Sequence, residues 1–210
     1  MNFLRKILDI LFPPGHVETR IIEMHRQGLL PKSLPTPHTQ IITALHYRDP
    51  LVRAGIRILK TKHNVPIAQC FAKLLHENLI ALLQDKTPFV RYEKIIIVPI
   101  PVTRRRLQER GFNQTELIAN ELAKISDIYT VKSFLEKIRE TKKQSVSTSK
   151  TKRKENIAGC FSCLKNTQQQ KSTLYVVLDD VVTSGATMNE ALVTLSKSGY
   201  KPVIGIAVAH

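Results

Sequence analysis

The sequence predicts an α/β protein whose mostly parallel, doubly wound sheet has helices on both faces. Three apolar runs, at 95–101, 174–178 and 203–209, are rich in β-branched residues and have the length of strands buried on both faces. Apolar residues at helical spacing lie between these runs. Alternation of strands with helices favours a parallel sheet, because parallel neighbours need a long crossover connection.

The chain of 210 residues is long enough for one α/β domain and a small appendage. Residues 1–40 are short amphipathic pieces separated by prolines, which we interpret as an N-terminal helical arm ahead of a domain at 41–210. Residues 41–60 are expected to be helical, with Pro50 as the start of a second piece. A strong helical pattern follows from Pro66 to Leu83.

The strand at 95–101 ends in two prolines. The next helix is expected to begin at Asn113, where Glu116 completes a start that resembles a capping box, and to run to about Ile125. Residues 128–131 form a candidate strand.

Residues 136–156 are basic and poor in apolar residues, which indicates a mobile loop. A further short strand is expected within 158–164. The apolar run at 174–178 is followed by a helical pattern over 188–198, with Gly199 at the position of a C-cap.

The net charge is +15, from 32 lysines and arginines against 17 acidic residues. Such a charge is informative about binding partners rather than about the fold. It favours binding to a nucleic acid or to a substrate with several phosphates. One basic cluster comprises Arg104, Arg105, Arg106 and Arg110, and a second runs from Lys137 to Lys154. A solvated, mobile surface is the alternative interpretation of these clusters.

The cysteine content indicates a cytoplasmic protein. Three cysteines, at 70, 160 and 163, do not make a disulfide framework. Cys160-x-x-Cys163 supplies only two of the four ligands that a structural zinc site needs, so no zinc is expected. No apolar stretch approaches the length of a membrane span.

The most informative segment is the strand, loop and helix that runs from Tyr175 to Thr187. Asp179 and Asp180 end the strand, where open α/β sheets bind ligands, and carboxylates there can accept the hydroxyls of a ribose. The loop of small and hydroxyl residues that follows ends at a helix N-terminus, which favours a phosphate. A helix-capping turn in an ordinary loop is the alternative. The chain has no Gly-x-x-x-x-Gly-Lys-Ser/Thr phosphate loop.

This segment resembles the signature of type I phosphoribosyltransferases, which implies that fold for residues 41–210. The resemblance implies that Asp179 and Asp180 hold the ribose hydroxyls of phosphoribosyl pyrophosphate and take part in catalysis. It assigns the 5′-phosphate to the loop residues Val182, Thr183, Ser184, Gly185, Ala186 and Thr187.

A second strand and loop precede the first basic cluster. Arginine suits polyphosphates because its donors form a planar fork. In the same superfamily the loop after the first core strand binds pyrophosphate, and Pro101, Arg104 and Arg105 match that position. An exposed basic turn is the alternative.

The combination of Pro-x-Pro at 99–101, Arg-Gly-Phe-Asn-Gln at 110–114 and the acidic run at 179–187 resembles the ComF family of competence-associated proteins. That resemblance adds Lys60, from an upstream Leu-Lys element, and Arg139, from a flexible hood, to the substrate-binding residues. Members of that family usually carry a four-cysteine zinc module near the N-terminus, whereas no cysteine precedes residue 70 in this sequence.

Two functions remain open at this point. The first is displacement of pyrophosphate from phosphoribosyl pyrophosphate by an unknown acceptor, assisted by Mg²⁺ held mainly through the substrate and linked to DNA uptake. The second is a non-catalytic protein that binds single-stranded DNA or DNA-processing proteins through its charge. The lack of tryptophan weakens the second. A homo-oligomer is compatible with either.

Overall fold

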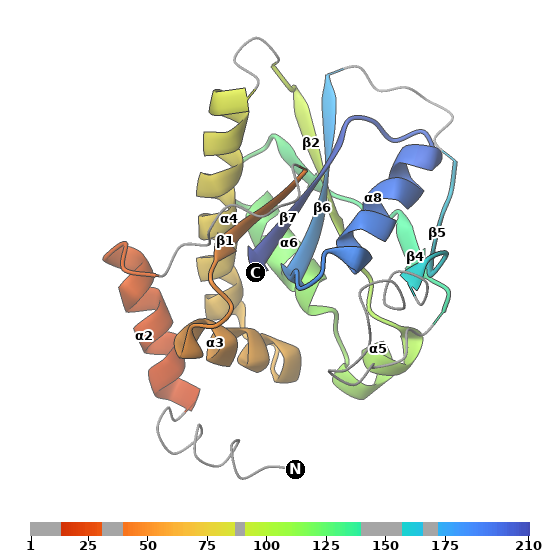
Figure 1. The fold of residues 1–210 in the computed structure, drawn as a ribbon. Coiled ribbons are helices and arrows are strands. Elements are labelled where there is room, and N and C mark those ends of the chain that lie inside the picture. Colours follow the sequence, from red (N-terminus) through yellow and green to blue (C-terminus); the bar gives the residue numbers. More distant parts are fainter. Residues whose placement is uncertain (1–13, 31–39, 87–90, 140–156, 166–171) are drawn as a thin grey trace.

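The computed structural model describes residues 14–30, 40–86, 91–139, 157–165 and 172–210 (Figure 1). Most of the arm expected at 1–40 and most of the hood expected after Arg139 therefore lie outside the described residues. Among the described residues, no helix combines the length and the apolar character that a bilayer span requires.

A five-stranded sheet forms the centre of the molecule (Figure 1). Its strands are β1 (Ile41–Leu45), β7 (Val203–Ala209), β6 (Thr173–Val181), β2 (Lys94–Pro99) and β3 (Tyr129–Val131), in that spatial order. Every neighbouring pair is parallel. The predicted α/β architecture with a parallel sheet is therefore confirmed.

Helices cover both faces of this sheet, as predicted. On one face lie α2 (Pro14–Arg26), α3 (Pro50–Thr61), α4 (Val65–Lys86) and α6 (Gln114–Ala123). The other face is covered by α8 (Ala186–Lys197) and by an antiparallel hairpin of β4 (Leu135–Lys137) and β5 (Phe161–Cys163). In Figure 1, α8 lies on the opposite side of the strands from α4.

The sequence of strand β2 is apolar at consecutive positions because both faces of the sheet are covered there. Ile95 and Ile97 belong to the hydrophobic core beneath α3, α4 and α6, whereas Ile96 and Val98 belong to the core beneath α8. Successive side chains of a strand point to opposite faces, so a strand between two helical layers must be apolar at every position.

The helix expected over 41–60 is wrong in its first part. Residues 41–45 form the edge strand β1, whose Ile41 lies beside Gly205 of β7. The β-branched residues Ile41, Ile42 and Thr43 favour a strand, and pairing with β7 outweighs a helical spacing that only a few apolar residues carried. The helix begins at Pro50, as expected, and the Asp49 carboxylate caps it by accepting the Leu51 N–H at 2.8 Å.

The segment after β2 contains a helix that the sequence did not predict. Helix α5 (Arg104–Arg110) begins after Thr103, whose hydroxyl accepts the Arg106 N–H, and ends at Gly111 with a φ of 77°. Only glycine adopts this left-handed conformation readily. The other expected strands and helices are present, with ends that differ by a few residues.

The order of the strands creates a crevice between β2 and β6. The chain leaves β2 through α5 and α6 to reach β3, and it leaves β6 through α8 to reach β7. Since β3 and β7 lie on opposite sides of the β2–β6 pair, the two connections diverge. Open α/β sheets bind ligands at such a switch point, outside the carboxyl ends of the strands.

Candidate ligand-binding site at the β2–β6 switch point

The acid pair lies at the carboxyl end of β6, beside this switch point. Asp180 is only 5% exposed, whereas Asp179 is half-buried. The alternation along β6 directs Asp180 toward α3 and α6 and Asp179 toward the α8 side, because Leu178 and Val177 belong to those two cores respectively. The two carboxylates therefore have different surroundings.

The buried carboxylate of Asp180 has two side-chain partners. Its Oδ2 atom lies 3.0 Å from Lys60 Nζ and accepts a hydrogen bond from Gln114 Nε2 at 2.8 Å. Gln114 Oε1 in turn accepts a hydrogen bond from Arg110 Nη1 at 2.9 Å. Helices α3, α5 and α6 thus each contribute one residue to a single polar network that ends on Asp180.

Asp179 is held differently. Its Oδ1 atom accepts the backbone N–H of Asp180 at 2.8 Å. Burial, and then the negative charge of Asp180, raise the pKa of Asp179 to about 7, against the opposing effect of Lys60 and Lys137. A carboxylate whose charge is disfavoured in this way gains most from a cation or from a hydroxyl donor that arrives with a ligand.

The loop from Val182 to Thr187 is anchored at its start and open at its end. The Val182 N–H donates to the Ala209 carbonyl at 2.9 Å, and the Val182 carbonyl accepts from His210 Nδ1 at 2.8 Å. The Val182 side chain is buried in the core beneath α8, so this residue fixes the loop.

Helix α8 begins directly after Gly185, which has a φ of 74°. No side chain of the described residues caps this helix, although caps are present at α3, α5 and α6. Thr183 is exposed, and Ser184 and Thr187 are half-buried, while Ala186 is buried. Uncapped N–H groups and nearby hydroxyls are suited to a phosphate.

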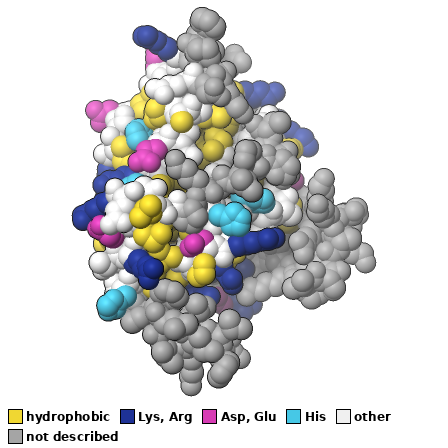
Figure 2. All heavy atoms as spheres, turned by 60° about the vertical axis from the view of Figure 1, so that its left-hand side comes forward, with side chains coloured by type: hydrophobic (Ala, Val, Ile, Leu, Met, Phe, Trp, Pro, Cys, Tyr) yellow, Lys and Arg dark blue, Asp and Glu magenta, His cyan; other side chains and the backbone are white. Residues whose placement is uncertain are grey.

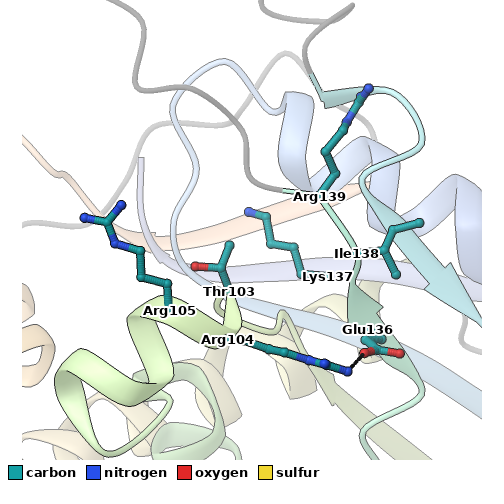
Figure 3. A pocket seen from close by; sticks show the side chains of 7 residues that line it. All are labelled: Thr103, Arg104, Arg105, Glu136, Lys137, Ile138 and Arg139. Atoms are coloured by element: carbon teal, nitrogen blue, oxygen red, sulfur yellow. Dashed lines mark hydrogen bonds and ion pairs between the residues drawn. The ribbon is translucent and has the colours of Figure 1, made fainter.

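A basic pocket of about 360 Å³ lies between the start of α5 and strand β4 (Figure 3). Its lining residues are Thr103, Arg104, Arg105, Glu136, Lys137, Ile138 and Arg139. Figure 3 shows Arg104 extended toward Glu136, with an ion pair of 3.0 Å between them. Both side chains are mostly exposed, so this pair contributes little stability.

The Arg-Gly-Phe-Asn-Gln motif fixes the geometry between pocket and acid pair. Asn113 caps α6 and donates from Nδ2 to the Ile100 carbonyl at 3.2 Å, and Thr115 Oγ1 donates to the same carbonyl at 2.7 Å. These bonds fasten the start of α6 to the end of β2. They bring Gln114, the next residue of the motif, onto Asp180.

Several known proteins are similar to this chain, although no protein-family model matches it. Competence protein F of Haemophilus influenzae is 27% identical over 158 residues, which cover 75% of this chain and 67% of that protein. DNA utilization protein YhgH of Escherichia coli is 28% identical over 169 residues, covering 80% and 71%. Competence protein ComFC of Bacillus subtilis is 32% identical over 104 residues, covering 50% and 39%.

These relatives support membership of the ComF family. The structure brings three of the predicted site residues together directly, since Lys60 and Asp180 form an ion pair and Asp179 is adjacent. Pro101 follows β2 at the switch point, and the loop 182–187 follows β6.

The predicted basic residues already have protein partners. Arg105 pairs with Glu109, one turn along α5, at 2.9 Å. Arg139 lines the pocket, but its guanidinium donates to the Ala158 carbonyl at 2.5 Å and so ties β4 to the segment before β5. Lys137 connects the two parts of the site, because it lines the pocket and its charge also acts on Asp179.

Sequence reasoning missed Gln114 and Arg110 as site residues. The motif was recognised, but only the arginines before it were assigned a role. The sequence carries no signal for Gln114, because a glutamine in the first turn of an amphipathic helix is expected to be exposed, whereas Gln114 is only 6% exposed in the structure. Its partner Asp180 lies 66 positions away, which no local pattern reveals.

The residues present suit a magnesium ion that arrives with a ligand. Within the described residues, no group of three or more histidine, cysteine, aspartate or glutamate side chains could hold a metal by itself. Mg²⁺ commonly takes one or two carboxylates and completes its octahedron with substrate phosphates and water. Asp179 could supply such a carboxylate, since its only hydrogen bond that the structure describes is to a backbone N–H.

Proposed function

We propose that this protein binds phosphoribosyl pyrophosphate with Mg²⁺ and displaces its pyrophosphate. The observation that carries the proposal is the meeting of an acid pair, an uncapped helix N-terminus and a basic pocket around one switch point. Lys137 links the pocket to the acids. A ligand with sugar hydroxyls between two phosphate-bearing ends matches all three parts.

Each part of the ligand has a chemical counterpart in the site. The ribose hydroxyls would donate to Asp179, and the 5′-phosphate would accept from the N–H groups at the start of α8. The pyrophosphate would enter the basic pocket and replace Glu136 as the partner of Arg104. Asp179 would help to hold Mg²⁺, which would supply neutralisation of negative charge on the departing group.

The reaction would exchange one bond at C1 of the ribose. The bond from C1 to the pyrophosphate oxygen breaks with its electron pair, a nitrogen of the acceptor forms the new bond, and the acceptor loses a proton. Positive charge develops on the sugar ring and negative charge on pyrophosphate. Arg104 and Lys137 would stabilise the negative charge, and the protein's contribution is mainly positioning.

Calorimetry with phosphoribosyl pyrophosphate and Mg²⁺ tests this proposal. We expect binding by the wild type and at least a tenfold loss of affinity in Asp179→Asn, because a charged hydrogen-bond acceptor is lost. The matched control is Asp127→Asn, which removes the same charge from an exposed turn before β3, at the opposite end of the parallel strands from the acid pair. Absence of heat with the wild type would refute the proposal.

The relatives favour a place for this activity in DNA uptake or use. Competence protein F and DNA utilization protein YhgH are so named, and they cover most of the chain. We infer that this protein serves the same kind of process. The experiment is deletion of its gene followed by a measurement of transformation with linear DNA, and complementation by Asp179→Asn shows whether the ligand site is needed.

Direct binding of single-stranded DNA is the second candidate. The net charge of +15 favours it through neutralisation of phosphates. On the side of the molecule that α2 and α4 cover, basic side chains are dispersed among acidic and apolar ones (Figure 2). Basic residues dispersed in this way are less suited to binding the backbone of single-stranded DNA than a continuous basic groove would be.

A further inference from the structure

One wall of the basic pocket is built on an element that the central sheet does not hold. The residues from the start of α5 follow β2 directly, whereas Glu136, Lys137, Ile138 and Arg139 come from β4 and its end. Among the described residues, β4 pairs only with β5, in a two-stranded sheet of its own. The position of this wall therefore depends on how the hairpin of β4 and β5 is attached to α8.

The hairpin is attached by apolar contacts and by one polar contact. At the end away from the pocket, Phe134 stacks on Tyr200 with ring centroids 4.5 Å apart. Nearer the pocket, the Phe161 side chain is buried in the core beneath α8. Just before Phe161, the Gly159 N–H donates a hydrogen bond to Glu190 Oε1 of α8 at 2.6 Å. This polar contact lies on the side of the hairpin that lines the pocket.

A single peptide group connects this polar contact with the pocket. The group between Ala158 and Gly159 donates its N–H to Glu190, and its carbonyl accepts a hydrogen bond from Arg139 Nη2 at 2.5 Å. The N–H and C=O of a trans peptide group point in opposite directions, so Glu190 and Arg139 lie on opposite sides of it. An anion at the N–H polarises the group and strengthens the bond that its carbonyl makes with a cation.

We propose that Glu190 is a positioning residue for the basic pocket, which holds Arg139 at the pocket wall through the peptide group between Ala158 and Gly159. This inference rests on the proposed function. Glu190 lies one turn beyond Ala186, the first residue of α8, where the 5′-phosphate would bind. The first two turns of α8 thereby support both phosphate-binding parts of the site.

The charge of Glu190 separates positioning from simple electrostatics. A carboxylate one turn from the start of α8 repels phosphates, so removal of its charge should by itself strengthen their binding. Loss of the hydrogen bond that it accepts should instead weaken binding in the pocket. Glu190→Gln and Glu190→Met remove the same charge and keep a similar length, but only glutamine retains an oxygen that can accept the Gly159 N–H.

Calorimetry with inorganic pyrophosphate and Mg²⁺, and separately with ribose 5-phosphate, tests the inference. We expect Glu190→Met to bind pyrophosphate about fivefold more weakly than Glu190→Gln, because Arg139 is then held less firmly at the pocket wall. The two variants should bind ribose 5-phosphate equally, since its phosphate would use the start of α8. A merely structural loss would lower both affinities together.

Glu77→Met is the matched control, because Glu77 is an exposed glutamate of α4, on the other face of the sheet. This variant should bind both ligands as the wild type does. Equal affinities of Glu190→Met and Glu190→Gln for pyrophosphate would overturn the inference and leave the proposed function in place. Absence of phosphoribosyl pyrophosphate binding by the wild type would instead remove the proposed function, and this inference with it.

Arg139→Met gives a second test of the route through the peptide group. If Glu190 acts through Arg139, this variant should itself bind pyrophosphate more weakly than the wild type. In the Arg139→Met background, Glu190→Met and Glu190→Gln should then have the same affinity, because the residue that they position is gone. A remaining difference between them would show that Glu190 acts by another route and would overturn the inference.

Discussion

Asp179 holds its proton up to a higher pH in the folded protein than in the unfolded chain. Its pKa is raised to about 7 in the structure, whereas an unfolded aspartate titrates near pH 4. Between these values the folded state binds more protons than the unfolded state. The free energy of unfolding therefore decreases as the pH rises through this interval.

Asp179→Asn should remove that dependence on pH. We expect the wild type to lose stability between about pH 4 and pH 7 relative to the variant, because only the wild type must ionise a carboxyl whose charge is disfavoured in the folded protein. Urea denaturation at several pH values measures this difference. Asp127→Asn serves as the control, and parallel profiles for wild type and Asp179→Asn would contradict the prediction.

Lys137 permits a second prediction on single residues. Because it lines the basic pocket, Lys137→Met should weaken binding of phosphoribosyl pyrophosphate by about tenfold and should weaken ribose 5-phosphate much less. Lys197→Met, at the exposed far end of α8, should leave both affinities unchanged. Titration calorimetry with the two ligands checks the difference, and an equal loss for both would contradict it.

At this scale the sequence indicated the acids and the phosphate loop because their chemistry is local. Asp179, Asp180 and the loop to Thr187 follow one strand without interruption. The ion pair of Asp180 with Lys60 joins residues of different elements, and no spacing rule connects them. The resemblance to a family placed Lys60 in the site, but only the structure shows its partner.

Among the elements, the contact of α2 with α3 depends on a missing side chain. A Cβ atom at Gly55 would lie 2.5 Å from Ile21 Cδ1 and 3.2 Å from Phe71 Cζ. Ile21 and Phe71 are both buried in the core beneath α3 and α4. Glycine at position 55 therefore leaves the room that the end of the Ile21 side chain occupies between α2 and α3.

Gly55→Ala should destabilise the protein by about 1–3 kcal/mol through overpacking of this contact. Gly15→Ala is the matched control, because nothing lies within 4 Å of its added Cβ atom. Gly15 lies in the first turn of α2, where that change should be neutral or slightly stabilising. Thermal unfolding of the two variants measures the contrast, and similar melting temperatures would contradict it.

Long or fully buried elements were predictable and short ones were not. Helix α4 repeats its apolar residues over 22 positions, and β6 is buried along nearly its whole length. Helix α5 has seven residues, none of them buried, so it presents no apolar face to recognise. Thr103 and Gly111 are suitable capping residues, but neither residue by itself predicts a helix between them.

For the whole molecule, the excess of positive charge predicts salt-sensitive binding to polyanions. Affinity for a single-stranded oligonucleotide should fall linearly on a plot of log affinity against log salt concentration. Arg105→Gln should reduce the slope by about 1 if this residue contacts a phosphate. Fluorescence anisotropy at several salt concentrations gives the slopes, and a flat line for the wild type would contradict binding by charge.

Competition connects this measurement with the ligand site. If an oligonucleotide uses the basic pocket, phosphoribosyl pyrophosphate with Mg²⁺ should displace it. If it uses another surface, both should bind together. The two outcomes assign the positive charge of the molecule either to the pocket or to a separate nucleic-acid surface.

The pairing of β2 with β6 has a consequence for which ligands the molecule can accept. The ladder extends to Pro99 opposite Leu178, and the Ile100 N–H still donates to the Leu178 carbonyl at 2.9 Å. The two loops therefore start about 4.8 Å apart, the ordinary strand spacing, and neither can shift without breaking the ladder. The distance between the starts of the two loops is therefore fixed, because both loops leave the same rigid sheet. We therefore expect a compound that contacts only one of the two loops to bind more weakly than a compound whose length lets it contact both.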